Sequence, residues 1–140
     1  MKVVIASDEL PPVVEHLAKR LRERGHAATV LPKAAWAAAA ADAARAVASG
    51  EFDQAIVCCW TGTGASIAAN KVRGIRAALC TDAATAAGAR KWNDANVLAL
   101  SLRLLSEPLA TEIVDAWLDA TYEGTERESL ERLLQEEARD

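Results

Sequence analysis

The chain has 140 residues, of which 51% are hydrophobic, and a net charge of −4, which suits one domain with a real core. Its scattered basic residues argue against nucleic acid as the main partner, and no apolar run approaches the ~20 residues of a membrane-spanning helix. Residues 1–7 are too short and too strand-like for a signal peptide. We therefore expect one domain over residues 1–140, located in the cytoplasm and without a membrane partner.

Hydrophobic spacing and turn residues predict strands and helices that alternate along the chain. Strands are expected at residues 3–6, 27–31, 54–59, 75–80 and 96–100. Helices are expected at residues 13–24, 34–49, 65–71, 82–91, 108–120 and 126–138. This alternation implies parallel strands with right-handed crossovers, and the nearly continuous apolar strands indicate helices on both faces. The predicted fold class is α/β: a three-layer αβα sandwich around a doubly wound, Rossmann-like, five-stranded parallel sheet.

The cysteines Cys58, Cys59 and Cys80 are an odd number without disulfide spacing, as is usual in a reducing compartment. Neighbours on a strand point to opposite faces, so Cys58 and Cys59 should not bind one metal ion together. His16 and His26 are expected on the surface, and we expect no metal site. The glycine-containing turn after Cys59 lacks the full dinucleotide fingerprint and a Walker lysine, so we also expect no cofactor.

The most informative segment is the strand-to-helix turn that follows Cys59. A predicted strand ends at this cysteine, and residues 60–64 read Trp-Thr-Gly-Thr-Gly before the next helix. Such a turn presents one side chain and several free backbone N–H groups to the same small space. A thiolate beside oxyanion donors is what proton abstraction next to a carbonyl requires. Because ligands of doubly wound sheets bind at the carboxyl ends of strands, Asp8 is expected at the same edge. The pattern predicts an enzyme that acts on carbonyl compounds.

Each of these residues also has a purely structural interpretation. Cys59 alone would be assigned to the core, since free cysteine is commonly buried, and only the motif around it favours a function. Asp8 can serve as a cap for the first helix. Trp60 and Trp92 fit a dimer interface or the core as well as a pocket, and Trp117 is expected in the core.

The motif continues through further segments of the chain. These are Ser-Asp at 7–8, SIAANK at 66–71, GIRAALC at 74–80, NDANVLAL at 93–100, IVDAWL at 113–118 and YEG at 122–124. Together with the turn after Cys59, they resemble the ribose-5-phosphate isomerase B and galactose-6-phosphate isomerase family. The resemblance implies an aldose–ketose isomerase of carbohydrate metabolism, such as the pentose phosphate pathway. It also implies a homodimer or tetramer with shared active sites, in which the helix at 126–138 packs on a neighbouring subunit.

The resemblance also implies roles for single residues. Cys59 would carry a proton between adjacent carbons of an open-chain sugar, while the backbone around Gly62 and Gly64 would hold the enediolate. Thr61 and Asp8 would handle sugar hydroxyls and ring opening. Further substrate-contacting or site-shaping positions are expected at Asn70 and Asn93.

Four positions near the expected pocket depart from the family pattern. Glu9 stands where the family has histidine after the aspartate, and Trp60 stands where it has glycine. Trp92 replaces a histidine that helps to open the sugar ring, and Trp36 replaces a tyrosine. Aromatic faces pack on sugar rings and other flat ligands, so we expect the three tryptophans to contact the substrate. Glu9 is expected to contact it because of its position in the family motif.

The family's phosphate-binding residues are also changed. After Tyr-Glu-Gly the family carries Gly-Arg-His and a second arginine, but this chain has Thr-Glu-Arg at 125–127 and Leu130. Arg103 is retained as an expected substrate contact. Arginine commonly binds phosphate through two parallel N–H donors, whereas a glutamate beside a phosphate repels it. We therefore expect altered phosphate and ring recognition. The alternative is a non-catalytic binding module or an inactive partner subunit of a hetero-oligomeric isomerase.

Overall fold

Five parallel strands form the sheet of the computed structural model, which describes residues 1–139. The strands are β1 (Lys2–Ser7), β2 (Ala27–Val30), β3 (Gln54–Cys59), β4 (Ala77–Leu79) and β5 (Val97–Ser101). They are ordered β2-β1-β3-β5-β4, and every neighbouring pair is parallel. Ile56 of β3 lies opposite Ile5 of β1 and Leu98 of β5. The predicted fold class is confirmed.

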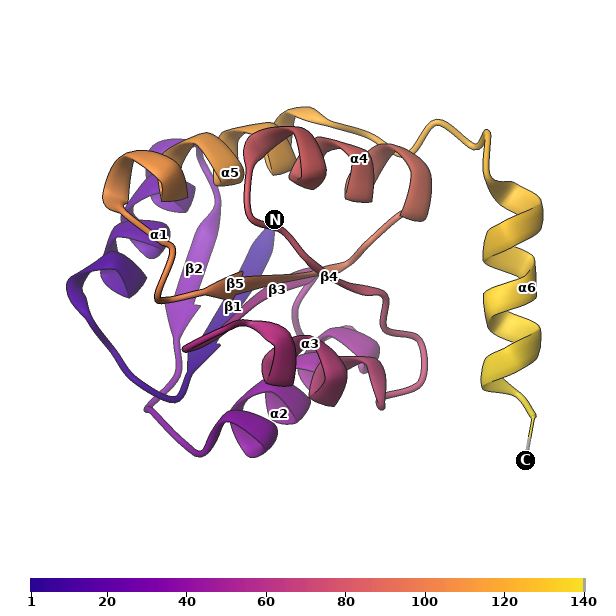
Figure 1. Cartoon of the computed structure of the whole chain (residues 1–140), viewed down its shortest axis with the longest axis horizontal. Helices are drawn as coiled ribbons and strands as arrows, with labels where there is room; N and C mark the ends of the chain where they lie inside the picture. Colours follow the sequence, from indigo (N-terminus) through magenta and orange to yellow (C-terminus); the bar gives the residue numbers. More distant parts are fainter. Residues whose placement is uncertain (140) are drawn as a thin grey trace.

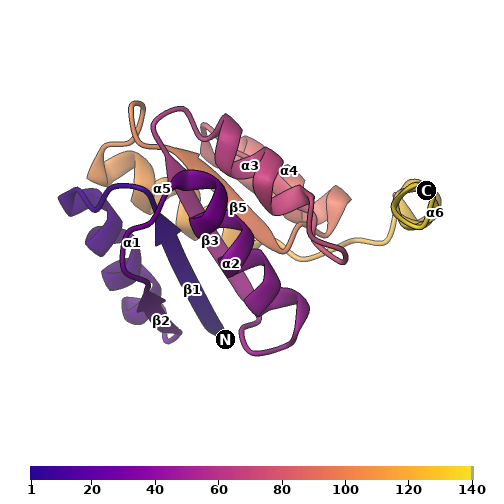
Figure 2. The same cartoon turned by 90° about the horizontal axis from the view of Figure 1, so that it is seen from below.

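Helices cover both faces of this sheet (Figures 1 and 2). They are α1 (Pro12–Glu23), α2 (Trp36–Ala48), α3 (Thr63–Asn70), α4 (Ala83–Asn93), α5 (Glu107–Asp119) and α6 (Arg127–Glu137). The strands contribute Ile5 and Leu98 to a core with α1, α4 and α5, and Val4 and Val57 to a core with α2 and α3. Trp117 is buried in the first core, as predicted. Across the described residues, every helix is too short or too polar to cross a bilayer.

The β4 strand is shorter than the sequence predicts. Only Ala77–Leu79 pairs with β5, whereas the apolar run at 75–80 predicts a longer strand. Side-chain amides replace the ladder at its start: Asn96 Oδ1 accepts the Arg76 N–H and Asn70 Oδ1 accepts the Ala77 N–H, both at 2.8 Å. Such bonds compete with regular backbone pairing, which is why the strand begins late.

The chain order creates a crevice between β1 and β3. The connection after β1 runs to β2 on one side, and the connection after β3 runs over β5 to β4 on the other side. The loops that leave the carboxyl ends of β1 and β3 therefore diverge. In open α/β sheets this switch point is where ligands bind, so the fold alone points to the residues that follow Ser7 and Cys59.

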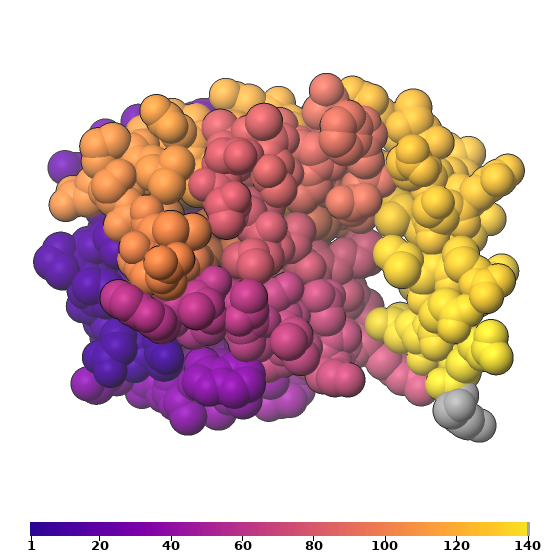
Figure 3. Space-filling model, viewed as in Figure 1, coloured from indigo at the N-terminus to yellow at the C-terminus, as the bar shows by residue number. Residues whose placement is uncertain are grey.

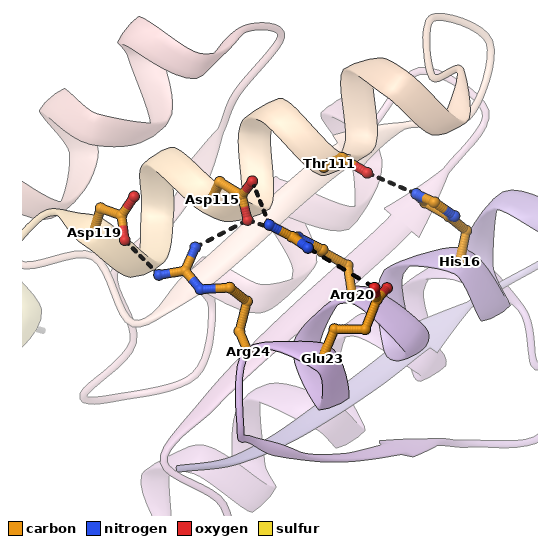
Figure 4. Close-up of polar contacts among 7 residues, drawn as sticks. All are labelled: His16, Arg20, Glu23, Arg24, Thr111, Asp115 and Asp119. Carbon is orange, nitrogen blue, oxygen red and sulfur yellow. Dashed lines mark hydrogen bonds and ion pairs between the residues drawn. The ribbon is translucent and has the colours of Figure 1, made fainter.

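A cluster of charged side chains joins α1 to α5 (Figure 4). Asp115 accepts hydrogen bonds from Arg20 Nε and Nη2 at 2.8 and 2.9 Å, and from Arg24 Nη1 at 2.9 Å. Arg24 also pairs with Asp119, and His16 lies 2.7 Å from the Thr111 hydroxyl. The Arg20 hydrogen bond, followed by that of Arg24, holds the pKa of Asp115 below its usual range against the opposing effect of burial.

Asp115→Asn is expected to lower the free energy of unfolding by about 1 kcal/mol at pH 7, because it removes the charge that two arginines share. The folded-state pKa of Asp115 is depressed. The stabilisation is therefore complete above the unfolded pKa of ~3.9 and is lost as the pH falls through the lower folded value. Urea unfolding from pH 7 to pH 2 should thus show a smaller pH dependence in the variant. Asp42→Asn, which breaks an exposed pair with Arg45 on α2, is the control and should leave both quantities unchanged.

The last helix, α6, stands beside the rest of the fold rather than on it (Figures 1 to 3). Within the described chain, no residue of α6 is buried. Its link to the body is a 2.8 Å hydrogen bond from the Gly74 N–H to Glu137 Oε1. Leu130, Leu133 and Leu134 line a groove of about 650 Å³ between α6 and the edge at β4. An apolar stripe left open in this way is typical of a surface that another chain covers.

Candidate active site

Cys59 ends β3 and faces the layer formed by α2 and α3. Its side chain is 5% exposed, and its carbonyl accepts the Leu102 N–H at 2.9 Å. Cys58 faces the opposite core, where burial raises the pKa of its thiol to about 12. Burial likewise raises the pKa of the Cys80 thiol to about 12. Cys58 and Cys80 are therefore core thiols. Of the three cysteines, Cys59 is the one at the start of the turn.

The turn that follows Cys59 is held firmly on the end of β5. Gly62 is the N-cap of α3 with φ +77°, and a Cβ atom built on it would lie 2.9 Å from the carbonyl of Leu100. Only glycine combines a positive φ with so close an approach. The first bond of α3 runs from the Ser66 N–H to the Gly62 oxygen, so the N–H groups of the preceding residues lie outside the helical ladder. Several backbone donors thus gather beside Cys59.

Polar contacts fix the rest of the turn. Ser101 Oγ and the Arg103 N–H both donate to the Trp60 carbonyl at 3.0 Å, while the Trp60 side chain is 66% exposed. The hydroxyls of Thr61 and Thr63 are 2.7 Å apart. The backbone is therefore tied to β5, and the side chains of Trp60 and Thr61 are left available to a ligand.

A cleft of about 980 Å³ opens at the switch point. It is lined by residues 8–13, 32–33, 102 and 105–107 together with Trp60. Asp8 Oδ1 is buried in its wall without a hydrogen-bond partner among the described residues. A buried carboxylate oxygen without a donor is costly, so Asp8 is suited to accept a hydrogen bond from a bound hydroxyl. Glu9 lies at the rim of the cleft, where its Oε2 atom is 3.9 Å from Lys33 Nζ.

The expected site residues fall into two groups at opposite ends of the sheet. Asp8, Glu9, Trp36, Cys59, Trp60, Thr61, Gly62, Gly64 and Arg103 lie at or near the carboxyl ends of the strands. Asn70, Trp92 and Asn93 lie at the ends of α3 and α4 that lead to the amino ends of β4 and β5. β5 spans five residues, so at ~3.3 Å per residue its first and last residues are roughly 13 Å apart. The second group therefore cannot join Cys59 of the same chain at one small ligand.

The second group has local contacts of its own. The Asn70 side chain donates to the Ala77 carbonyl at 2.9 Å and accepts the Ala77 N–H at 2.8 Å. Trp92 folds back along α4, where its ring would meet a Cβ at Gly88 at 2.7 Å, and it is 50% exposed. Asn93 is exposed in the groove beside α6. Asn70 thus holds the fold, while Trp92 and Asn93 face outward.

Lys33 was not expected in the site from the sequence. It lies in the loop between β2 and α2 and reaches the cleft beside Glu9. A single exposed lysine in a loop carries no periodic or motif signal, so only the fold reveals its position. Within residues 1–139, no group of three or more His, Cys, Asp or Glu side chains is arranged to hold a metal ion.

A cysteine, a run of backbone donors and an unpartnered carboxylate at the switch point of a parallel sheet define the class as an α/β protein with an enzyme-like site. A family model described as Ribose/Galactose Isomerase matches residues 3–133. The chain therefore belongs to this family, and the prediction of an aldose–ketose isomerase is confirmed as a reaction class.

Similar proteins and a similar solved structure agree with this assignment. Ribose-5-phosphate isomerase B of Escherichia coli K12 is 42% identical over 131 residues, which cover 88% of this chain and 87% of that protein. D-erythrulose-4-phosphate isomerase of Pectobacterium atrosepticum is 51% identical over 81 residues, covering 58% of this chain and 53% of that protein. The solved structure of ribose-5-phosphate isomerase B from Clostridium thermocellum matches with a TM-score of 0.92 at 39% identity, covering 98% of this chain and 97% of that one.

Proposed function

We propose that this chain interconverts a small aldose and ketose through an enediolate, with Cys59 as the proton carrier. The observation that carries the proposal is the position of Cys59 at the carboxyl end of β3, directly before the first-turn N–H groups of α3. The Cys59 sulfur is a group that can accept a proton, and the N–H groups of the turn are preorganised donors for an oxyanion.

The chemistry needs no electrons from outside the substrate. Cys59 removes a proton from the carbon next to the carbonyl, and the electron pair moves to the carbonyl oxygen to give the enediolate. The backbone donors around Gly62 and Gly64 stabilise that negative charge. Cys59 then returns the proton to the neighbouring carbon, while Thr61 and Asp8 move the hydroxyl protons. Bonds broken and formed balance, and aldose becomes ketose.

Of the expected site residues, Asp8, Glu9 and Trp60 line the cleft, whereas Cys59 faces the layer of α2 and α3. The cleft lining favours recognition through hydroxyls and a flat aromatic face. Asp8, Glu9 and Glu107 line it, and the one cation among its lining residues is Lys33, 3.9 Å from Glu9. A phosphate dianion placed there would be repelled. The relatives named above act on ribose 5-phosphate and erythrulose 4-phosphate. We propose a four- or five-carbon sugar for this chain, with any phosphate held by Arg103 or by a neighbouring subunit.

Proton exchange in heavy water tests the activity. The protein would be incubated with free and phosphorylated tetroses, pentoses and hexoses, and NMR would record deuterium at the carbon next to the carbonyl. The proposal predicts exchange with a short sugar, together with formation of the matching ketose or aldose. An absence of exchange with every sugar would contradict the proposal and support an inactive subunit or a binding module.

A second copy of the chain would complete the site. Trp92 and Asn93 lie at the wrong end of the sheet for Cys59 of their own chain, so they can act on substrate only in a partner. The apolar side chains of Ile67, Leu104 and Leu134 are 61%, 47% and 58% exposed. Such exposed apolar surface is typical of an interface. We propose a homodimer in which α6 packs on the neighbouring subunit.

Leu134→Glu is expected to weaken this dimer by at least about tenfold in dissociation constant, because a charge would be buried in an apolar contact. Sedimentation velocity over a concentration series measures the change. Gln135→Glu introduces the same charge at the next position of α6 and serves as the control. Equal dissociation of both variants, or of neither, would contradict the role of the leucine face.

A further inference from the structure

The turn beside Cys59 is held between two surfaces. On its inner side, Gly62 meets the end of β5, where a Cβ would lie 2.9 Å from the Leu100 carbonyl. On its outer side, Gly64 meets the indole ring of Trp36, where a Cβ would lie 2.9 Å from Cε3 and Cζ3. Each contact leaves no room for even one additional carbon. The backbone of the turn is therefore closely packed against other residues on both sides.

Trp36 supplies the outer contact because α3 has only small buried side chains with which to hold its first turn in place. The buried residues of α3 are Ala65 and Ala69, whose side chains end at Cβ. Ile67 is large but 61% exposed. Trp36 is the first residue of α2, and although it is 45% exposed, its six-membered ring covers the α-carbon of Gly64. A broad rigid ring at this point limits outward movement of the turn.

We propose that Trp36 is a positioning residue that acts through Gly64: its indole ring holds the N–H donors of the first turn of α3 where the enediolate forms. This inference rests on the proposed function, because it concerns the donors used in that reaction. Misplacement of preorganised donors by about 1 Å lowers turnover more than binding. The role predicts an effect on kcat that passes from residue 36 to residue 64.

A double-mutant cycle between these residues tests the proposal. Gly64 lies in a helix without a positive φ, so alanine suits its backbone and the ring of Trp36 is the obstacle. Gly64→Ala alone is expected to lower kcat roughly 30-fold, and Trp36→Ala roughly tenfold, with KM changed less than about threefold. In the double variant the new methyl group has space, so kcat should equal that of Trp36→Ala within about threefold. Trp36→Phe should retain more turnover than Trp36→Ala.

Val47→Ala separates positioning from general loss of stability. Val47 is buried near the far end of the same helix, and its truncation should lower Tm without lowering kcat. Additive effects of the Trp36 and Gly64 changes on kcat, or effects confined to KM, would overturn the proposal. Failure of the proposed function has a different signature, because Cys59→Ala would then keep its turnover.

Discussion

Cys59→Ala is expected to lower kcat by at least about 1000-fold, which is within the range for loss of a general base. Cys59 lies at the end of β3, directly before the turn, and alanine there has no group that can accept a proton. Because the change removes one sulfur atom from a nearly buried site, Tm should fall by only a few degrees. Turnover with the substrate found by proton exchange, together with circular dichroism and thermal unfolding, measures both effects.

Cys58→Ala is the matched control for this prediction. The two cysteines are adjacent but face opposite cores, and burial, the largest of the causes, raises the pKa of the Cys58 thiol to about 12. Cys58 is therefore protonated at neutral pH and cannot serve as the base. Its replacement should cost about 1 kcal/mol of stability and leave kcat unchanged. Equal losses of kcat in both variants would refute a specific role for Cys59.

The overall architecture could be predicted because its signals are local and repeated. Alternating apolar runs and helical spacing identify all five strands and all six helices of the described chain. The boundaries were less accurate where side chains take over backbone bonds. Asn96 binds the backbone of Arg76 and Asn70 that of Ala77, 20 and 7 residues away along the chain. No propensity reveals that such an amide will replace a strand partner.

The site could be predicted only in part for a related reason. A strand end followed by a Thr/Gly turn marks the carboxyl edge of a sheet, so Cys59 and Asp8 could be assigned to one edge from the sequence. Trp92 and Asn93 end a helix and precede a strand, which places them at the amino edge. The family resemblance joins both groups in one site, and a single chain cannot do so. The packing of Trp36 on Gly64 has no sequence signal, because it joins two helices through a residue without a side chain.

Gly62→Ala is expected to lower the free energy of unfolding by about 2–4 kcal/mol and to lower kcat at least tenfold. Two effects add at this position. Its φ of +77° is strained for alanine, and the new Cβ would lie 2.9 Å from the Leu100 carbonyl and 2.6 Å from Leu79 Cδ1. Either β5 or the turn must shift, and the turn carries the donors beside Cys59. Urea unfolding and steady-state kinetics measure the two losses.

Gly25→Ala isolates the backbone strain from the steric contact. Gly25 has a φ of +87°, but a Cβ there would meet nothing within 4 Å. Its replacement should therefore cost only the roughly 1–2 kcal/mol of a left-handed alanine and leave kcat unchanged, since it lies after α1 and away from the turn. The difference in the free energy of unfolding between the two glycine variants measures how closely the turn packs against β5. Equal stabilities together with equal kcat would mean that this fit does not hold the donors in place.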